Sequence, residues 1–325
     1  MKYPIDKELR LIAKLKVPAN IKLAAAMSKA TKMFKCKTDE KVNVMEHYVG
    51  GHGGEKIKTY VIEPKTFEGE LPCLVFYHGG GFVMGASGGH YNLAKEYAEK
   101  VPCKVIYPDY RLAPEFKYPI PAEDCYAVYE WALWNADSLG IDKERVYIGG
   151  DSAGGCLAAA VTLMARDRGL VMPHKEVLIY PVTDRTMITE SMRNFTDTPV
   201  WDARLSKMMW EAYLGDREPE HPEYASPAEA YSLERFPQTY MEVAEFDSLH
   251  DEGLMFANRL KIAGISVEMH EIKGACHGYE TAGSSRITRE CMARRIQGLQ
   301  GAGHNSNTDK PDEVNRLIEE FVKGL

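Results

Sequence analysis

The stretch Gly150-Asp151-Ser152-Ala153-Gly154-Gly155 decides the fold of this chain. It has the form G-x-S-x-G, in which a serine stands on a turn so tight that its neighbours must be small. The preceding residues 146–148 are apolar and strand-like, and the following residues 156–160 favour a helix. A strand, a turn and a helix in this order expose the serine at the carboxyl end of the strand, beside a helix N-terminus that favours negative charge. We therefore predict that Ser152 is a nucleophile.

The pattern on both sides of this motif is an alternation of strands and helices. Such an alternation is typical of an α/β fold with a mostly parallel sheet that is covered by helices on both faces. The predicted strands are 42–49, 56–62, 74–77, 104–107, 146–148, 177–180, 240–244 and 267–272. The predicted helices are 91–99, 122–134, 153–166, 252–262 and 284–299.

Three segments depart from this alternation. Residues 183–238 are too long for a plain connection, and long insertions of this kind often form lids. The first forty-odd residues have helical periodicity on either side of Pro18, with apolar residues at Leu9, Ile12, Leu15, Ile21, Leu23 and Met27. A polar stretch, 301–311, precedes a short amphipathic helix that we expect at 313–322.

Composition excludes several classes of protein. The 325 residues are 45% hydrophobic and 27% charged, which is ordinary for a globular protein. The net charge of −7 argues against nucleic acid as a partner, because proteins that neutralise phosphates are usually basic. We expect no secretory leader, because residues 1–8 contain no apolar run or small-residue cleavage site, and no membrane span, because no apolar stretch is long enough. The seven cysteines form no CxxC pair, so we expect reduced thiols in a cytoplasmic protein, without a zinc site or disulfides.

A second motif, His78-Gly79-Gly80-Gly81, follows the apolar residues 74–77. Consecutive glycines are unfavourable in regular elements, because glycine loses the most backbone entropy on ordering. They suit a loop whose amides point at a ligand, which is what the oxyanion of a tetrahedral acyl intermediate needs. We predict an oxyanion hole from Gly79, Gly80, Gly81 and the amide of Ala153. This second signal disfavours the alternative that the G-x-S-x-G turn only packs or binds a phosphate.

The acid and the base should follow later strands, since the chain order for this kind of nucleophile is Ser, then Asp or Glu, then His. The strand 240–244 leads to Asp247, which we predict to be the acid. Glu245 is a weaker competitor, and Asp251 fits better as a helix N-cap. The strand 267–272 leads to His277, which we predict to be the base.

The remaining histidines are not expected to take part in catalysis. His52 lies among glycines between two edge strands and fits a hairpin turn. We expect His78 to be a buried residue that holds its loop through hydrogen bonds. His250, His270 and His304 are expected to be solvated residues without a catalytic role.

These motifs together make the chain similar to the hormone-sensitive lipase family of carboxylesterases. The resemblance covers about residues 71–299 and rests on the order and spacing of residues 78–82, Tyr110-Arg111-Leu112-Ala113-Pro114-Glu115, residues 150–155, Asp247 with Asp251, and His277-Gly278. It implies an eight-stranded α/β-hydrolase core under a helical cap. It also implies that Ser152, Asp247 and His277 form the catalytic triad, with Gly80 and Gly81 as the chief oxyanion donors besides Ala153.

The resemblance further implies a division of the chain. Residues 1–45 would be N-terminal cap helices, residues 46–182 and 236–325 the catalytic domain, and residues 183–235 a cap insertion. Within the 110–115 block, Arg111 and Glu115 would tie loops together. Some family members pair through edge strands or their last helices, so a homodimer is one expectation.

The predicted reaction is hydrolysis of a small ester with a short acyl chain, through an acyl-enzyme and without metal or organic cofactor. Trp201, Trp210 and Tyr213 in the insertion would suit an apolar pocket wall, although core packing accounts for them equally well. An amidase, lactonase or thioesterase could use the same triad, because the pocket rather than the triad sets the substrate. A ligand-binding protein that has lost hydrolysis is a second alternative, but such a protein would be expected to lack a triad member.

Overall fold

A computed structural model describes residues 2–31, 33–67 and 69–300 of the chain. The helix expected at 313–322, the stretch 301–311 and His304 lie outside these residues. At the centre is an eight-stranded sheet with the strand order β1-β2-β4-β3-β5-β6-β7-β8. Its strands are β1 (Val42–Gly50), β2 (Lys56–Pro64), β3 (Leu71–Tyr77), β4 (Lys104–Pro108), β5 (Ile141–Asp151), β6 (Lys175–Ile179), β7 (Gln238–Phe246) and β8 (Val267–Cys276).

The sheet is mostly parallel, as predicted. β2 pairs antiparallel with both β1 and β4, whereas all pairs from β4 across to β8 are parallel. The parallel strands therefore end at one edge of the sheet, and β5, β7 and β8 deliver the predicted nucleophile, acid and base to that edge. The hairpin between β1 and β2 contains His52, in agreement with the prediction for that residue.

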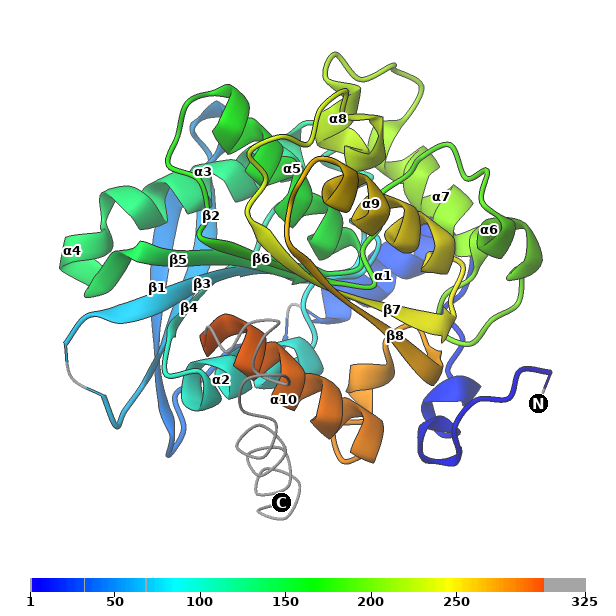
Figure 1. Ribbon diagram of the computed structural model, residues 1–325, viewed down its shortest axis with the longest axis horizontal. Coiled ribbons are helices and arrows are strands. Elements are labelled where there is room, and N and C mark those ends of the chain that lie inside the picture. The colour runs from blue at the N-terminus through cyan, green and yellow to red at the C-terminus, as the bar shows by residue number, and fades with distance from the viewer. Residues whose placement is uncertain (1, 32, 68, 301–325) are drawn as a thin grey trace.

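Helices cover both faces of the sheet, so two hydrophobic cores form (Figure 1). α3, α5 and α9 cover one face, and α2 and α10 cover the other. In β3 the side chains alternate between these cores: Cys73, Val75 and Tyr77 join the first, and Leu74 and Phe76 join the second. The helices are α1 (Ile21–Thr31), α2 (Gly88–Lys100), α3 (Ile120–Trp134), α4 (Ala136–Leu139), α5 (Ala153–Asp167), α6 (Glu190–Asn194), α7 (Ala203–Leu214), α8 (Pro222–Ala225), α9 (His250–Ile262) and α10 (Arg286–Gln300).

The N-terminal segment is less helical than its periodicity predicted. Leu9 and Ile12 are buried, but they lie in two short 3-10 turns, Lys7–Leu9 and Ile12–Lys14, and a regular helix begins only at Ile21. An isolated helix this short is marginal in water. Here Ile5, Leu9 and Ile12 pack into the second core, and the two turns keep their own short-range backbone hydrogen bonds. The segment meets the 183–235 insertion through a bridge between Lys16 and Val200.

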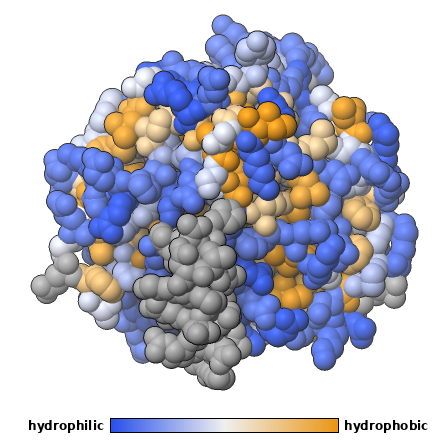
Figure 2. Space-filling view, viewed as in Figure 1, coloured by the Kyte–Doolittle hydropathy of each residue, from blue (hydrophilic) through white to orange (hydrophobic). Residues whose placement is uncertain are grey.

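The insertion contributes α6, α7, α8 and a 3-10 turn, Pro227–Glu229. α7 is amphipathic and buries Leu205, Met209 and Trp210 in the first core. Figure 2 shows a surface on which hydrophilic side chains predominate and hydrophobic ones are interspersed. Among the described residues, no helix is both long enough and apolar enough to span a bilayer.

Candidate active site

The turn between β5 and α5 holds Ser152 in a strained backbone conformation, with φ 54° and ψ −120°. A non-glycine residue at positive φ costs free energy, which the surrounding structure must offset. The Ser152 amide donates to the Ile179 carbonyl, and the Ser152 carbonyl accepts from the amides of Val182 and Cys156. These hydrogen bonds fix the turn, which directs the hydroxyl to the sheet edge.

The glycines around Ser152 are required by close backbone contacts. A Cβ at Gly150 would lie 2.3 Å from the Gly154 backbone, and a Cβ at Gly154 would lie 2.0 Å from the Tyr77 carbonyl oxygen. A Cβ at Gly155 would lie 2.8 Å from the Pro181 side chain. Small residues at these positions therefore allow α5 to start directly beneath the serine, so that the helix N-terminus lies beside the hydroxyl.

Three side chains from three strand ends meet at this point. The Ser152 hydroxyl lies 3.0 Å from Nε2 of His277, and Nδ1 of His277 lies 2.6 Å from Oδ2 of Asp247. Ser152 is 125 residues from His277 in the sequence, and Asp247 is 30 residues from it. All three side chains are buried. This chain of hydrogen bonds requires the proton on Nδ1 of His277, which leaves Nε2 free to accept the proton of Ser152.

The electrostatic surroundings of His277 favour its protonated form. Burial lowers the pKa of His277, but the negative charge of Asp247 and its hydrogen bond outweigh burial, so the pKa is raised above 6.5. The second Asp247 oxygen, Oδ1, accepts the amide of Leu249 at 3.0 Å, which fixes the carboxylate. The site can therefore stabilise an imidazolium while it holds the ring in one orientation.

The two competing acids lie elsewhere. Glu245 accepts the amide of Gly274. The prediction that Asp251 is an N-cap is wrong: Leu249 occupies that position, and Asp251 lies in the first turn of α9. Its carboxylate contacts His250 and accepts the amide of Ser191, so it binds α9 to the insertion.

The glycine loop after β3 faces the serine. In the part of the chain that the structure describes, the amides of Gly80, Gly81 and Ala153 donate to no protein group. The amide of Gly79 differs from the prediction, because it donates to Oδ1 of Asp151 at 3.0 Å. Gly79 therefore anchors the loop, and the other three amides are available to a developing oxyanion.

His78 is fully buried and holds this loop, as expected. Its Nδ1 contacts the Gly79 carbonyl at 2.7 Å, and its ring stacks on Tyr110 with 4.4 Å between centroids. The Tyr110 hydroxyl donates to the His78 carbonyl. Burial lowers the pKa of His78 to about 4, so this ring stays neutral.

Comparison with known proteins identifies the family of this chain. A family described as having the alpha/beta hydrolase fold matches residues 74–281. Esterase LipI of Mycobacterium tuberculosis is 33% identical over 73% of this chain and 75% of its own length. The chain belongs to the hormone-sensitive lipase family of carboxylesterases. Ethyl acetate hydrolase of Pseudomonas putida is also similar, with 32% identity over 65% of this chain and 67% of its own length. Among solved structures, a bacterial heroin esterase superposes with a TM-score of 0.83 and 32% identity, over 92% of this chain and 98% of that chain.

Two residues that border the site, Asp151 and Tyr180, were not identified from the sequence. Asp151, inside the quoted motif, is buried and anchors the glycine loop through Gly79. An acidic residue next to the nucleophile, at the end of a buried strand, was the signal that could have found it. Tyr180 packs its ring against His277, with 4.5 Å between centroids, and its hydroxyl donates to Glu280. Nothing in the local sequence distinguishes Tyr180 from a core tyrosine.

Trp201 is a residue of the 183–235 insertion that lies next to the site. Its ring centroid lies 5.8 Å from that of His277, and a Cβ at Gly81 would lie 2.5 Å from the indole. Trp201 therefore borders both the base and the glycine loop. Trp210 and Tyr213 pack instead against Phe82, the residue that follows the glycine loop.

The 110–115 block ties loops together through one of its two charged residues. Arg111 pairs with buried Asp124 and donates to the His52 carbonyl. Glu115 is exposed.

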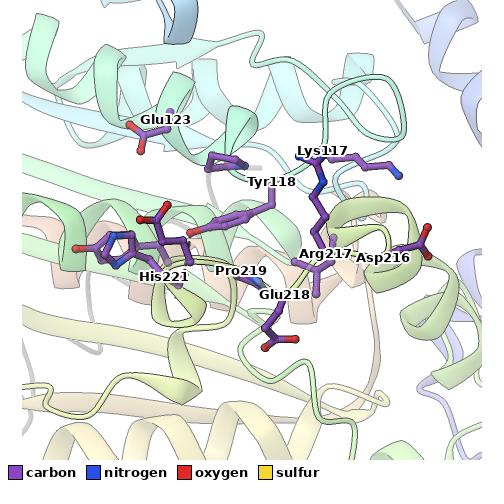
Figure 3. A pocket seen from close by; sticks show the side chains of 12 residues that line it. Lys117, Tyr118, Glu123, Asp216, Arg217, Glu218, Pro219 and His221 are labelled. Atoms are coloured by element: carbon purple, nitrogen blue, oxygen red, sulfur yellow. Dashed lines mark hydrogen bonds between the residues drawn. The ribbon is translucent and has the colours of Figure 1, made fainter.

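A surface cavity of about 580 Å³ lies apart from the triad, beside Tyr118 and His221 (Figure 3). Its lining mixes positive and negative side chains, and none of the triad residues contributes to it. The described residues contain no group of three or more histidine, cysteine or acidic side chains that could hold a metal ion.

Proposed function

We propose that the protein hydrolyses small, short-acyl esters through a triad of Ser152, His277 and Asp247. The observation that carries this proposal is the continuous hydrogen-bonded path from the serine hydroxyl through the imidazole to a buried carboxylate. Membership in a carboxylesterase family supplies the substrate class.

The proposed first half-reaction forms an acyl-enzyme. Nε2 of His277 takes the Ser152 proton while the serine oxygen forms a bond to the ester carbonyl carbon, and the carbonyl electron pair moves to oxygen. The amides of Gly80, Gly81 and Ala153 would stabilise this oxyanion. When the intermediate collapses, the ester C–O bond breaks and the leaving alkoxide takes the proton from His277.

The second half-reaction repeats these steps with water. His277 removes a proton from a water molecule while the water oxygen attacks the acyl carbon. The bond between the acyl carbon and the Ser152 oxygen then breaks, and the serine oxygen takes the proton back from His277. The products are an alcohol and a carboxylic acid. Asp247 keeps the imidazole oriented and stabilises its positive charge, and it stays ionised throughout.

Three further features extend the proposal. Residues 1–45 and 183–235 would form the cap, because they meet at Lys16 and Val200 and because Trp201 borders the site. Trp201 would limit acyl-chain length, since its indole lies close to the glycine loop.

The buried free thiols of all seven cysteines support the cytoplasm as the compartment.

A panel of matched substrates tests the proposed specificity. We expect p-nitrophenyl acetate and butyrate to be hydrolysed with a higher kcat/KM than the octanoate and palmitate. We also expect little turnover of p-nitroacetanilide, the amide that corresponds to the acetate. A preference for palmitate would contradict the short-acyl assignment, and faster turnover of the amide than of the ester would contradict the ester assignment.

A further inference from the structure

The charges of this chain are strongly segregated along the sequence. No aspartate or glutamate occurs between Glu8 and Asp39, although the chain as a whole has more acidic than basic residues. The same interval contains eight basic residues: Arg10, Lys14, Lys16, Lys22, Lys29, Lys32, Lys35 and Lys37. Among the ion pairs of the described residues, none involves a basic residue of this interval.

The same interval exposes large apolar side chains. Six of the fifteen exposed large hydrophobic residues in the described part of the chain lie here: Leu11, Leu15, Leu23, Met27, Met33 and Phe34. Exposed apolar side chains that gather on one segment, unlike scattered ones, indicate a contact surface.

α1 arranges both kinds of side chain on its outer surface. Ala24 and Ser28 are buried and face the protein, whereas Leu23 and Met27, four residues apart, project outward on one flank. Lys22 and Lys29 are exposed on the other flank, seven residues apart and therefore also on one side of the helix. Ala26 lies exposed between the two flanks.

We propose that the exposed face of α1, together with residues 33–37, docks the protein on an anionic lipid surface. An interfacial helix of this kind inserts apolar side chains between headgroups while its lysines contact anionic phosphates. A complete absence of carboxylates over this interval is what such a surface demands, because each carboxylate would be repelled. A second copy of this chain fits less well, since it would bring a second positive face against the first.

The position of α1 connects this surface to the site. The Ser28 hydroxyl accepts the Gly85 amide at 3.0 Å, and Ala24 packs in one cluster with Val83. α1 therefore covers the loop that continues from Gly80 and Gly81. Docking would bring this loop close to esters dissolved in the lipid; this consequence rests on the proposed function, whereas the docking itself does not.

Binding to vesicles tests the docking independently of hydrolysis. The Ser152→Ala protein is sedimented with phosphatidylcholine vesicles that contain about one-third phosphatidylglycerol, at low and high salt, and with pure phosphatidylcholine vesicles. We expect binding only to the anionic vesicles, and expect salt to weaken it. Absence of binding at low salt, or equal binding to both kinds of vesicle, would overturn the proposal.

Matched variants locate the binding surface. Lys22→Glu/Lys29→Glu/Lys35→Glu should weaken binding by at least about tenfold, whereas Lys56→Glu/Lys65→Glu/Lys261→Glu, with the same change in net charge at other exposed lysines, should have little effect. Leu23→Ser/Met27→Ser should also weaken binding, whereas Met255→Ser/Ile262→Ser should not. Equal losses in test and control variants would overturn the proposal.

Two further readouts distinguish a lipid surface from a second copy of the chain as the occupant of this face. A solvent-sensitive dye on Ala26→Cys is selective, because the native cysteines are buried, and its emission should shift to the blue only with anionic vesicles. If light scattering instead shows a dimer that Leu23→Ser/Met27→Ser dissociates, and vesicles do not bind, a second copy covers this face and the proposal is wrong.

Discussion

Nδ1 of His277 lies 2.6 Å from Oδ2 of Asp247, although the two residues follow different strands and are 30 positions apart. Asp247→Asn should therefore keep the fold but lower kcat by about 10⁴-fold, because the amide no longer holds the required tautomer or stabilises the imidazolium. The measurement is kcat for p-nitrophenyl butyrate. Asp251→Asn is the matched control and should retain most of the activity, since Asp251 contacts His250 and Ser191 rather than His277.

The pH dependence should change in the same variant. The base must be unprotonated, so kcat/KM should rise with pH through the pKa of His277, which burial lowers but Asp247 raises by more. Without the carboxylate charge the acid limb of the profile should move to lower pH. An acid limb at the same pH in both proteins would contradict the assignment of that limb to His277.

Glu176 on β6 should make stability depend on pH. It is fully buried, and burial raises its pKa from 4.5 to about 8. Between these two values the native protein keeps a proton that the unfolded chain releases, so stability should fall as pH rises, by up to about 1.4 kcal/mol per pH unit. Glu176→Gln mimics the protonated acid and should gain stability relative to the wild type as the pH increases. Urea unfolding across this range is the measurement, and parallel stability curves would refute the expectation.

The buried ion pair between Arg295 on α10 and Glu242 on β7 should matter for stability. Two guanidinium nitrogens contact the Glu242 carboxylate at 2.6 and 3.0 Å, and Tyr279, two residues beyond His277, also donates to it. Arg295→Met leaves a buried carboxylate without its cation and should cost about 3–5 kcal/mol. Arg294→Met, on the preceding residue, should cost little. The double variant Glu242→Gln/Arg295→Met should lose less than Arg295→Met alone, and an equal loss would argue against this cause.

Trp201 should set the acyl-chain preference. Replacement by alanine removes the indole beside Gly81 and His277, so the ratio of kcat/KM for octanoate over acetate should rise by about tenfold or more. Trp134→Ala removes an indole that is 72% exposed and should leave the ratio unchanged. An unchanged ratio in Trp201→Ala would show that another residue limits the pocket.

The features that the sequence predicted are those that depend on local pattern. The central strands are continuous apolar runs because they are buried on both faces, and the elbow at Ser152 needs small residues at fixed spacing. The sequence could place Asp247 and His277 at the same edge of the sheet as Ser152, because the carboxyl ends of parallel strands meet there.

Features that depend on distant partners could not be read from the sequence. The amide of Gly79 donates to Asp151, which is 72 residues away. The sequence could therefore not show that this amide has a hydrogen-bond acceptor within the protein and differs from the amides of Gly80 and Gly81. The partner of Arg295 is 53 residues away, and its burial follows only from how α10 packs. The 3-10 turns near the N-terminus arise from contacts with the sheet core, which override the helical periodicity of the segment.

The role of Ser152 is tested most directly by hydrolysis of p-nitrophenyl butyrate by the wild type and Ser152→Ala, together with labelling by a fluorophosphonate. We predict rapid wild-type turnover and a loss of about 10⁶-fold in kcat in the variant, at unchanged thermal stability. The label should attach to the peptide that contains Ser152 and should be absent from the variant. Equal turnover by both proteins, or labelling of a different residue, would contradict the assignment of Ser152 as the nucleophile.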